Sequence, residues 1–96
     1  NYFENIPLAD DPDFRLEQNY PNPYDGKTNI EFMLPYSGHV HFFVNDVIGR
    51  QVYQENASYD AGRHVVTFDR GDLPAGVYYY GIEFNGERRM SKMIVR

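Results

Sequence analysis

The chain of 96 residues contains 42% hydrophobic and 24% charged residues, has no cysteine and carries a net charge of −5. A chain of this length builds one hydrophobic core, which excludes a multidomain enzyme. The lack of cysteine excludes disulfides, thiolate metal sites and a cysteine nucleophile. Nine Tyr and seven Phe favour strands, because aromatic rings pack well on a pleated surface, and they predict an all-β domain.

The charge is concentrated near the N-terminus. Residues 1–25 hold six acidic residues and one basic residue, whereas residues 26–96 hold eight of each. Four cations and no acidic residue follow Glu87. Four cations form only a small basic surface for binding a phosphate backbone, so nucleic acid is not an expected partner. No apolar run approaches the roughly 18 residues of a membrane span, and none is expected.

Residues 1–13 are predicted to form an acidic linker and residues 14–96 one domain. Asn1–Asp13 shows neither helical nor alternating periodicity and contains two prolines. Its Asp10–Asp13 run favours a solvated linker, with a calcium site as the alternative. Because Asn1 is not an initiator Met and no signal peptide is present, we expect a piece of a longer or processed protein.

The domain is predicted to contain seven short strands, because segments with period-two alternation recur between turn residues. In chain order they are Phe14–Asn19, Asn29–Leu34, the stripe Val40, Phe42 and Val44, Arg50–Glu55, Arg63–Asp69, the stripe Tyr78, Tyr80, Ile82 and Phe84, and Arg88–Val95. In the fifth strand His64, Val66 and Phe68 are expected to face the core. Alternation alone does not decide which face of Arg88–Val95 is buried.

The connections between these segments favour antiparallel pairing. Asp46–Arg50 suits a type I turn with a capping Asp side chain and a left-handed Gly49. Asn85–Gly86 is a strong signal for a two-residue hairpin, which pairs the last two strands. We therefore expect two packed antiparallel sheets.

The sequence offers no constellation for catalysis. Its serine and histidine candidates lie in no nucleophile-elbow context: Ser37, Ser58, Ser91, His39, His41 and His64. His39 and His41 share one strand face, but without a third ligand at a telling spacing ordinary strand histidines are favoured over a metal site. No enzymatic activity, metal or cofactor is expected.

Three further patterns have a functional and an ordinary interpretation. Arg70–Gly71–Asp72 spells the cell-adhesion tripeptide, although an ordinary turn fits equally well. Asn56–Ala57–Ser58 is an N-glycosylation pattern, which matters only in a eukaryotic secretory pathway. Tyr53 and Tyr79 are the best candidates for an aromatic sugar-binding platform, but strand preference explains the many tyrosines more simply.

Several separated motifs carry a more specific signal. They are Tyr20-Pro21-Asn22-Pro23, Thr28 with Ile30 and Phe32, Leu34-Pro35, Val40–Asp46, Gly49-Arg50, Ala61–His64, Asp72–Tyr80 and Ser91–Val95. Over about residues 14–96 the sequence resembles the C-terminal sorting domain of the type IX (Por) secretion system and the related immunoglobulin-like domains of the hook-capping type. It departs from the family at one place: many members have Trp where Phe68 stands and then an Asp-Gly turn, which Asp69-Arg70-Gly71 shifts by one residue.

The resemblance implies a seven-stranded antiparallel immunoglobulin-like β-sandwich that acts as a non-catalytic secretion and sorting signal. It implies a cargo domain before Asn1 in a protein of a Gram-negative bacterium, transit through the periplasm, and passage through an outer-membrane translocon that recognises this domain. A sortase-like peptidase then removes the domain, and the cargo is secreted or stays at the cell surface. The alternative is an accessory immunoglobulin-like module of a secreted enzyme, with or without carbohydrate binding.

The residues expected to form sorting motifs or to contact the translocon come from four parts of the chain. The prolines of Tyr20-Pro21-Asn22-Pro23 favour an architectural role for that motif. Leu73–Tyr78 also favours such a role, because it resembles the corner of sandwich folds in which a Tyr hydroxyl bonds to an upstream backbone group. Apolar Val47 and Ile48 at a hairpin tip must pack back or meet a partner, and the cationic last strand can add to a partner's sheet edge. The set is Tyr20, Pro21, Asn22, Pro23, Val47, Ile48, Gly49, Arg50, Leu73, Pro74, Gly76, Tyr78, Lys92 and Met93. Exposed sheet edges also allow a weak homodimer.

Overall fold

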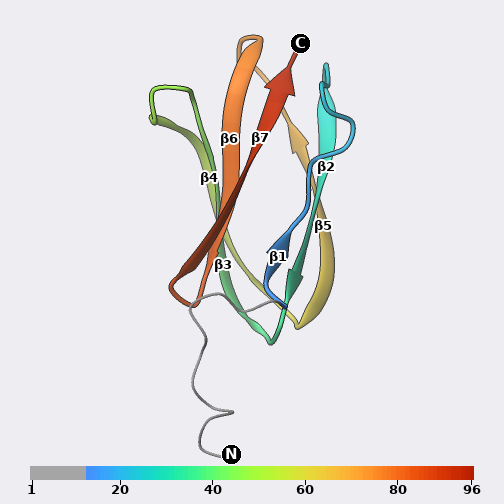
Figure 1. Cartoon of the computed structure of the whole chain (residues 1–96), viewed down its shortest axis with the longest axis vertical. Helices are drawn as coiled ribbons and strands as arrows, with labels where there is room; N and C mark the ends of the chain where they lie inside the picture. The colour runs from blue at the N-terminus through green and yellow to red at the C-terminus, as the bar shows by residue number, and fades with distance from the viewer. Residues whose placement is uncertain (1–12) are drawn as a thin grey trace, which may run out of the picture.

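A computed structural model describes residues 13–96, so the predicted linker lies outside the described residues except for Asp13. Figure 1 shows the seven strands of this part of the chain. They are β1 (Arg15–Leu16), β2 (Lys27–Leu34), β3 (Gly38–Asn45), β4 (Gln51–Tyr59), β5 (Gly62–Asp69), β6 (Gly76–Phe84) and β7 (Glu87–Val95). Within residues 13–96 there is no helix that could cross a membrane.

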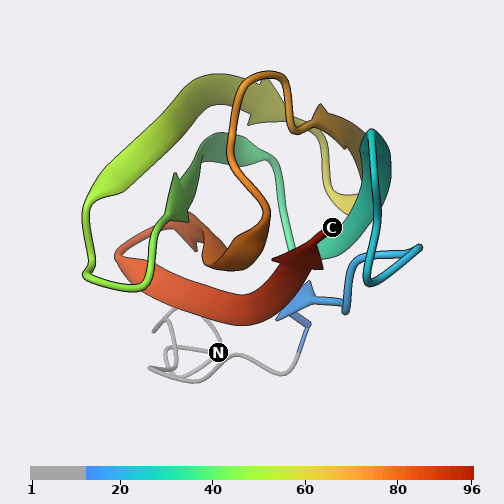
Figure 2. The same cartoon turned by 90° about the horizontal axis from the view of Figure 1, so that it is seen from above.

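The strands form two antiparallel sheets that face each other. One sheet has the order β1-β2-β5 and the other the order β4-β3-β6-β7. Seen from above, the two sheets curve around a common interior (Figure 2). The connections between the sheets are those of immunoglobulin-like sandwiches. In this variant β4 pairs with β3 and not with β5. The predicted all-β, seven-stranded antiparallel sandwich is therefore confirmed.

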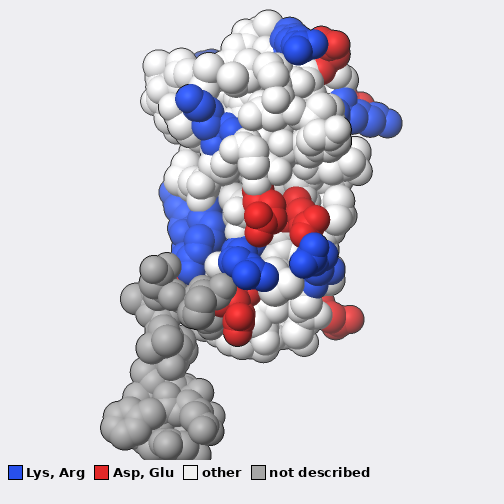
Figure 3. Space-filling model, turned by 45° about the vertical axis from the view of Figure 1, so that its right-hand side comes forward, with Lys and Arg blue, Asp and Glu red and all other residues white. Residues whose placement is uncertain are grey.

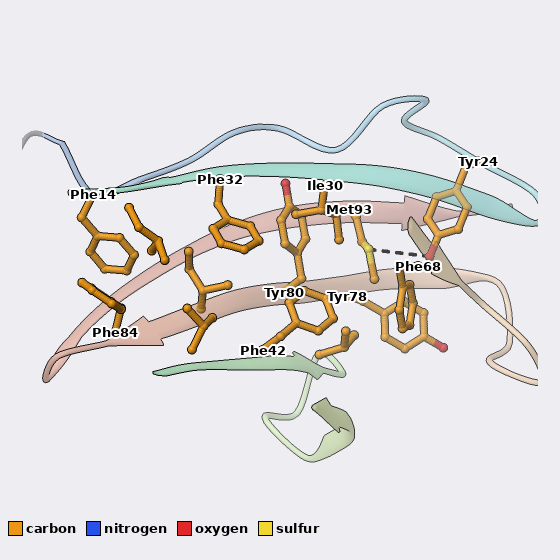
Figure 4. Packing of buried hydrophobic residues seen from close by; sticks show 14 of the residues in the cluster. Phe14, Tyr24, Ile30, Phe32, Phe42, Phe68, Tyr78, Tyr80, Phe84 and Met93 are labelled. Carbon is orange, nitrogen blue, oxygen red and sulfur yellow. Dashed lines mark hydrogen bonds between the residues drawn. The ribbon is translucent and has the colours of Figure 1, made fainter. Parts of the chain in front are cut away.

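The core lies between the inner faces of the sheets, as the alternation predicts (Figure 4). All of the stripe residues expected in the third and sixth strands are buried, together with Ile30, Phe32 and Leu34 of β2. On β5, Phe68 is buried, Val66 packs against the core, and the half-buried His64 ring lies 5.4 Å from that of Phe32. The predicted inner face of β5 is therefore correct.

The register of the β6–β7 hairpin decides which face of β7 is buried. Asn85 and Gly86 have φ values of 51° and 81°, as the predicted two-residue turn requires. The turn pairs Phe84 with Glu87, and the same register places Met93 opposite Tyr78. Met93 and Val95 accordingly face the core and are 0% and 2% exposed.

Two strands differ most from their predicted bounds, whereas β2, β5 and β7 only begin one or two residues earlier than expected. The first was expected over Phe14–Asn19, but β1 ends at Leu16, because residues 17–19 make irregular hydrogen bonds that position the site described below. The fourth was expected over Arg50–Glu55, but β4 continues to Tyr59, because it pairs with β3 along its whole length. The polar sequence of β4 gave no alternation to follow.

Phe43 is buried on the outer face of the four-stranded sheet, where alternation predicts an exposed side chain. Its neighbour Gly81 on β6 has no side chain, and the Phe43 ring occupies that place. The guanidinium carbon of Arg88 lies 4.8 Å from the ring centroid and covers it. Phe43 is therefore only 2% exposed.

Candidate functional site

Three loops and the last residue of the chain lie at the same end of the sandwich (Figure 1). We call this the motif end and define it by residues 17–26, 46–50, 70–76 and 92–96. The described chain begins at the opposite end (Figure 1), where the Phe14 ring lies 5.5 Å from that of Phe84 at the end of β6. With Tyr78, which packs beneath it, the motif end contains every residue of the expected site.

Residues 20–24, which we call the proline segment, cover the free edge of β7. The Asn22 Oδ1 accepts a hydrogen bond from the backbone N–H of Ile94 at 2.9 Å. The Tyr24 N–H donates to the Ile94 carbonyl at 3.1 Å, and the Arg96 N–H donates to the Tyr24 carbonyl at 2.9 Å. Tyr24 thereby forms a parallel bridge with Val95. The first motif and the last strand of the chain are one structural unit.

Gln18 extends this contact along β7. Its Nε2 donates to the Lys92 carbonyl at 2.7 Å, and its Oε1 accepts from the Ser91 hydroxyl at 3.2 Å. The Lys92 side chain itself remains exposed. The C-terminal half of the β7 edge is thus largely occupied by partners from the same chain, which limits its pairing with another strand.

A buried polar network supports the proline segment from inside. The Thr28 hydroxyl donates to the Pro21 carbonyl at 2.8 Å, and the Asn19 Nδ2 donates to the Thr28 Oγ1 at 3.0 Å. The Tyr80 hydroxyl donates to the Glu17 carbonyl at 2.7 Å and accepts from the Asn19 N–H at 2.8 Å. Asn19 and Thr28 are 2% and 1% exposed, so these hydrogen bonds satisfy groups that burial would otherwise penalise.

The proline segment presents its own side chains outward. Pro21, Asn22 and Pro23 are exposed, and Tyr20 is 78% exposed. The Tyr20–Pro21 and Asn22–Pro23 peptide bonds are both cis. The segment therefore combines a fastened backbone with an exposed surface.

Met93 lies inside the domain, next to Tyr24 (Figure 4). The Tyr24 hydroxyl is 3.7 Å from the Met93 sulfur. Burial raises the pKa of Tyr24 to about 12, against the opposing effect of the nearby Arg70 charge. Because Met93 is buried, a partner does not contact it directly, and Met93 acts only by supporting the surface above it.

The predicted tyrosine corner is present between β5 and β6. The Tyr78 hydroxyl donates to the Pro74 carbonyl at 2.7 Å, and the Tyr78 side chain is buried. Leu73 packs partly against the core, whereas Pro74 and Gly76 are exposed. These residues fix the loop that approaches the β3–β4 hairpin.

The predicted turn at residues 46–50 is also present. Asp46 Oδ1 accepts hydrogen bonds from the Ile48 and Arg50 backbone N–H groups at 3.1 and 2.9 Å, and Gly49 has a φ of 87°. Although burial raises the pKa of Asp46, these hydrogen bonds and the Arg50 side chain outweigh it and hold the pKa below its usual value. Val47 and Ile48 do not pack back and are 66% and 79% exposed.

A shallow groove separates this hairpin from the tyrosine corner. Its lining includes Val47, Val52, Leu73, Pro74 and Tyr78. Residues from two of the expected motifs, far apart in the sequence, therefore meet along one depression of the motif end.

The structure does not place Tyr53 and Tyr79 on a common platform. Tyr53 pairs with inward-facing Val44, and its ring lies 5.1 Å from that of Phe68. Tyr79 pairs with Asn45 and faces outward on the same sheet. The cavity beside Tyr53 has a volume of about 30 Å³, which holds roughly two water molecules and no sugar ring. The two candidate tyrosines thus do not form one sugar-binding platform, and the simpler explanation by strand preference remains.

The candidate metal ligands are not brought together either. The His41 Nδ1 lies 2.9 Å from the Asn56 Oδ1, which gives this histidine an ordinary surface partner. Among the described residues no three His, Cys, Asp or Glu side chains group in a way that could hold a metal ion. The calcium alternative at Asp10–Asp13 lies outside the described residues apart from Asp13.

Sequence reasoning missed Gln18, Tyr24 and Arg70 as parts of the site. Each has a partner between 45 and 74 residues away, and no local pattern reveals such a contact. The one local signal was their position within or beside motifs already recognised, since Tyr24 directly follows Pro23 and Arg70 precedes the corner.

The fold and this arrangement define an immunoglobulin-like sandwich whose last strand is fastened to a proline-rich segment near the start of the domain. Residues 18–96 match the family described as the secretion system C-terminal sorting domain. The chain belongs to this family, the sorting domains of type IX secretion, which confirms the resemblance. A search of curated proteins gives no match. A domain of this family is a secretion and sorting signal of a secreted or cell-surface protein, and it interacts with the type IX machinery.

Proposed function

We propose that the motif end is the surface by which the type IX translocon recognises this domain and the cargo joined to it. The cargo crosses the periplasm of a Gram-negative bacterium and then the outer membrane, and a sortase-like peptidase removes the domain, which has no catalytic role. The observation that supports this proposal is the convergence of four separated motifs at one end of the sandwich.

The exposure of side chains at the motif end supports a protein partner. Tyr20, Val47 and Ile48 are large apolar residues that are at least 66% exposed, although a hairpin tip and a turn normally carry polar residues. Their backbones are held by the hydrogen bonds of Asp46 and of the Thr28 network. A partner therefore meets a surface that is already ordered, which lowers the entropy lost on binding.

The expected residues divide between contact and support. The exposed ones are proposed to touch the translocon: Tyr20, Pro21, Asn22, Pro23, Val47, Ile48, Gly49, Arg50, Pro74, Gly76 and Lys92. Leu73, Tyr78 and Met93 are proposed to hold that surface from within, because each packs in or against the core.

The proposal is tested by fusing residues 1–96 to the C-terminus of a periplasmic reporter in a cell with an active type IX system. We expect the reporter outside the cell, and we expect it in the periplasm when residues 92–96 are deleted. The same fusion in a cell without the translocon is the control. Retention of the intact fusion in the periplasm of the competent cell contradicts the proposed function.

A further inference from the structure

Arg70 connects three separate segments of the motif end. Its guanidinium donates hydrogen bonds to the backbone carbonyl of Leu73 from Nε at 3.2 Å and from Nη2 at 2.9 Å. Its Nη1 donates to the carbonyl of Asp25 at 3.0 Å and to that of Arg96. The side chain thereby ties the tyrosine corner, the segment before β2 and the end of β7 to one another.

The backbone of Arg70 is fixed in the same way. Its N–H donates to the Gly26 carbonyl and its own carbonyl accepts from the Leu73 N–H, both at 3.0 Å. Because both sides of this short loop are anchored, the guanidinium is presented in one orientation. Its charge also reaches the buried Tyr24 hydroxyl, whose pKa it lowers against the larger effect of burial.

Arginine is suited to this arrangement because its planar group carries five N–H donors in a fixed fork, whereas lysine has a single ammonium group. Hydrogen bonds from a charged donor are roughly twice as strong as neutral ones. The last residues of a domain fray unless they are tied down, and Arg96 follows directly after the edge strand β7. The Arg70 contacts supply such an anchor.

These contacts also account for the Arg70–Gly71–Asp72 triplet. The Asp69 Oδ1 accepts from the Gly71 N–H at 2.9 Å, and Gly71 has a φ of 57°, so the triplet forms a closed turn. With its guanidinium engaged by three carbonyls, Arg70 acts inside this domain and not as a ligand of an adhesion receptor.

We propose that Arg70 is a positioning residue that holds residues 94–96, the end of β7 and the residue after it, in the geometry recognised during sorting. This inference rests on the proposed function, because only recognition of the motif end gives the order of these residues a role in export. It adds Arg70 to the residues that were expected from the sequence to form the sorting motifs.

The test compares Arg70→Gln and Arg70→Lys with Arg63→Gln as a matched control. Arg63 is an exposed arginine at the other end of β5, where its Nη1 lies 2.7 Å from the Glu31 Oε2. Amide hydrogen exchange is measured on the domain, and export is measured with the reporter fusion. In Arg70→Gln we expect the Ile94 and Arg96 amides to exchange about tenfold faster or more, with central β3 amides unchanged, and export to fall about tenfold.

The lysine variant separates positioning from charge. It keeps the positive charge, but one ammonium group does not reach all three carbonyls, so we expect intermediate exchange and only partial export. Because it is a milder change, it also provides the comparison if Arg70→Gln loses its fold. Arg63→Gln is expected to behave as the unaltered domain in both measurements.

Each remaining outcome contradicts the inference at a defined point. Unchanged exchange at Ile94 and Arg96 shows that Arg70 does not anchor the end of β7. Faster exchange with full export shows that the anchor is structural only. Failure of the unaltered fusion to leave the periplasm contradicts the proposed function, and the exchange data then still decide whether the anchor exists.

Discussion

The side chain of Asn22 and the backbone N–H of Ile94, 72 residues apart in the sequence, are joined by a hydrogen bond of 2.9 Å. The bond lies at the edge of the four-stranded sheet, where an unpaired strand otherwise presents free backbone groups to solvent or to another chain. Asn22 therefore serves both as part of an exposed turn and as a cap for the last strand.

Replacing Asn22 with alanine is expected to lower the free energy of unfolding by about 1 kcal/mol, because the Ile94 N–H loses its partner. For a domain of this size, the melting temperature falls by about 4–8 °C. The matched control is Asn56→Ala. Asn56 is an exposed asparagine of β4 that is hydrogen-bonded to His41 of β3. Equal losses of stability and of reporter export in the two variants contradict a special role for Asn22.

The double variant Val47→Ser and Ile48→Ser is expected to reduce export while leaving stability within about 0.5 kcal/mol per site, because both side chains face solvent. Val65→Ser is the control, since Val65 is 57% exposed on the other sheet, away from the motif end. Export is measured with the reporter fusion and stability by urea denaturation. Full export of the double variant excludes the hairpin tip from the recognised surface.

Replacing Gly81 with alanine is expected to destabilise the domain by about 1–3 kcal/mol or more. The added Cβ would lie 2.5 Å from the Phe43 Cζ and 2.7 Å from the Arg89 backbone oxygen. Shortening Phe43 to leucine in the same chain is expected to restore only part of the loss, because the backbone contact remains. Gly26→Ala is the control, because no atom lies within 4 Å of its added Cβ. Similar urea midpoints for the two alanine variants contradict the packing argument.

The stability of the domain is expected to fall between about pH 10 and pH 12. Tyr24 ionises near pH 10 in the unfolded chain, whereas burial raises its pKa to about 12 in the folded domain. In this interval the folded state keeps a proton that the unfolded chain has lost, so increasing pH favours unfolding. Below pH 10 this contribution is constant.

Urea denaturation across this interval measures the effect, and Tyr24→Phe is expected to make the decline shallower. Some decline remains, because burial also raises the pKa of Tyr80. Identical pH dependence in the unaltered domain and in Tyr24→Phe contradicts the assignment of this effect to Tyr24.

Much of the fold was predictable because a two-residue period is a local property. The inner stripes of β3 and β6 follow from it directly, and the turns at Gly49 and Asn85 follow from backbone chemistry. The buried face of β7 was also within reach. A two-residue turn at Asn85–Gly86 pairs Phe84 with Glu87, and counting outward along both strands places Met93 opposite Tyr78.

The length of β4 and the burial of Phe43 were not predictable from local patterns. β4 extends to Tyr59 because Gly38 of β3 offers it a partner there, and its own polar sequence gives no signal. Phe43 is buried because Gly81, 38 positions later, leaves room for its ring. Both depend on which strands become neighbours.

For the candidate site, the motifs were visible in the sequence but their connections were not. The tyrosine corner and the capped hairpin were predicted from short patterns and are present. The anchors formed by Gln18 and Arg70 were missed, since a glutamine or an arginine in a loop has no preferred distant partner until the fold supplies one.

The described chain starts at the end of the sandwich opposite to Arg96 (Figure 1). Positively and negatively charged side chains are interspersed over the face in Figure 3. That face therefore has no electrostatic field of a single sign that would attract one partner to both ends. In the proposed function, a translocon on the motif end and a sortase-like peptidase near the start of the described chain lie at opposite ends of the sandwich and do not compete for space. Under that proposal one molecule can engage both at once, and the cargo can depart while its former tail is still held.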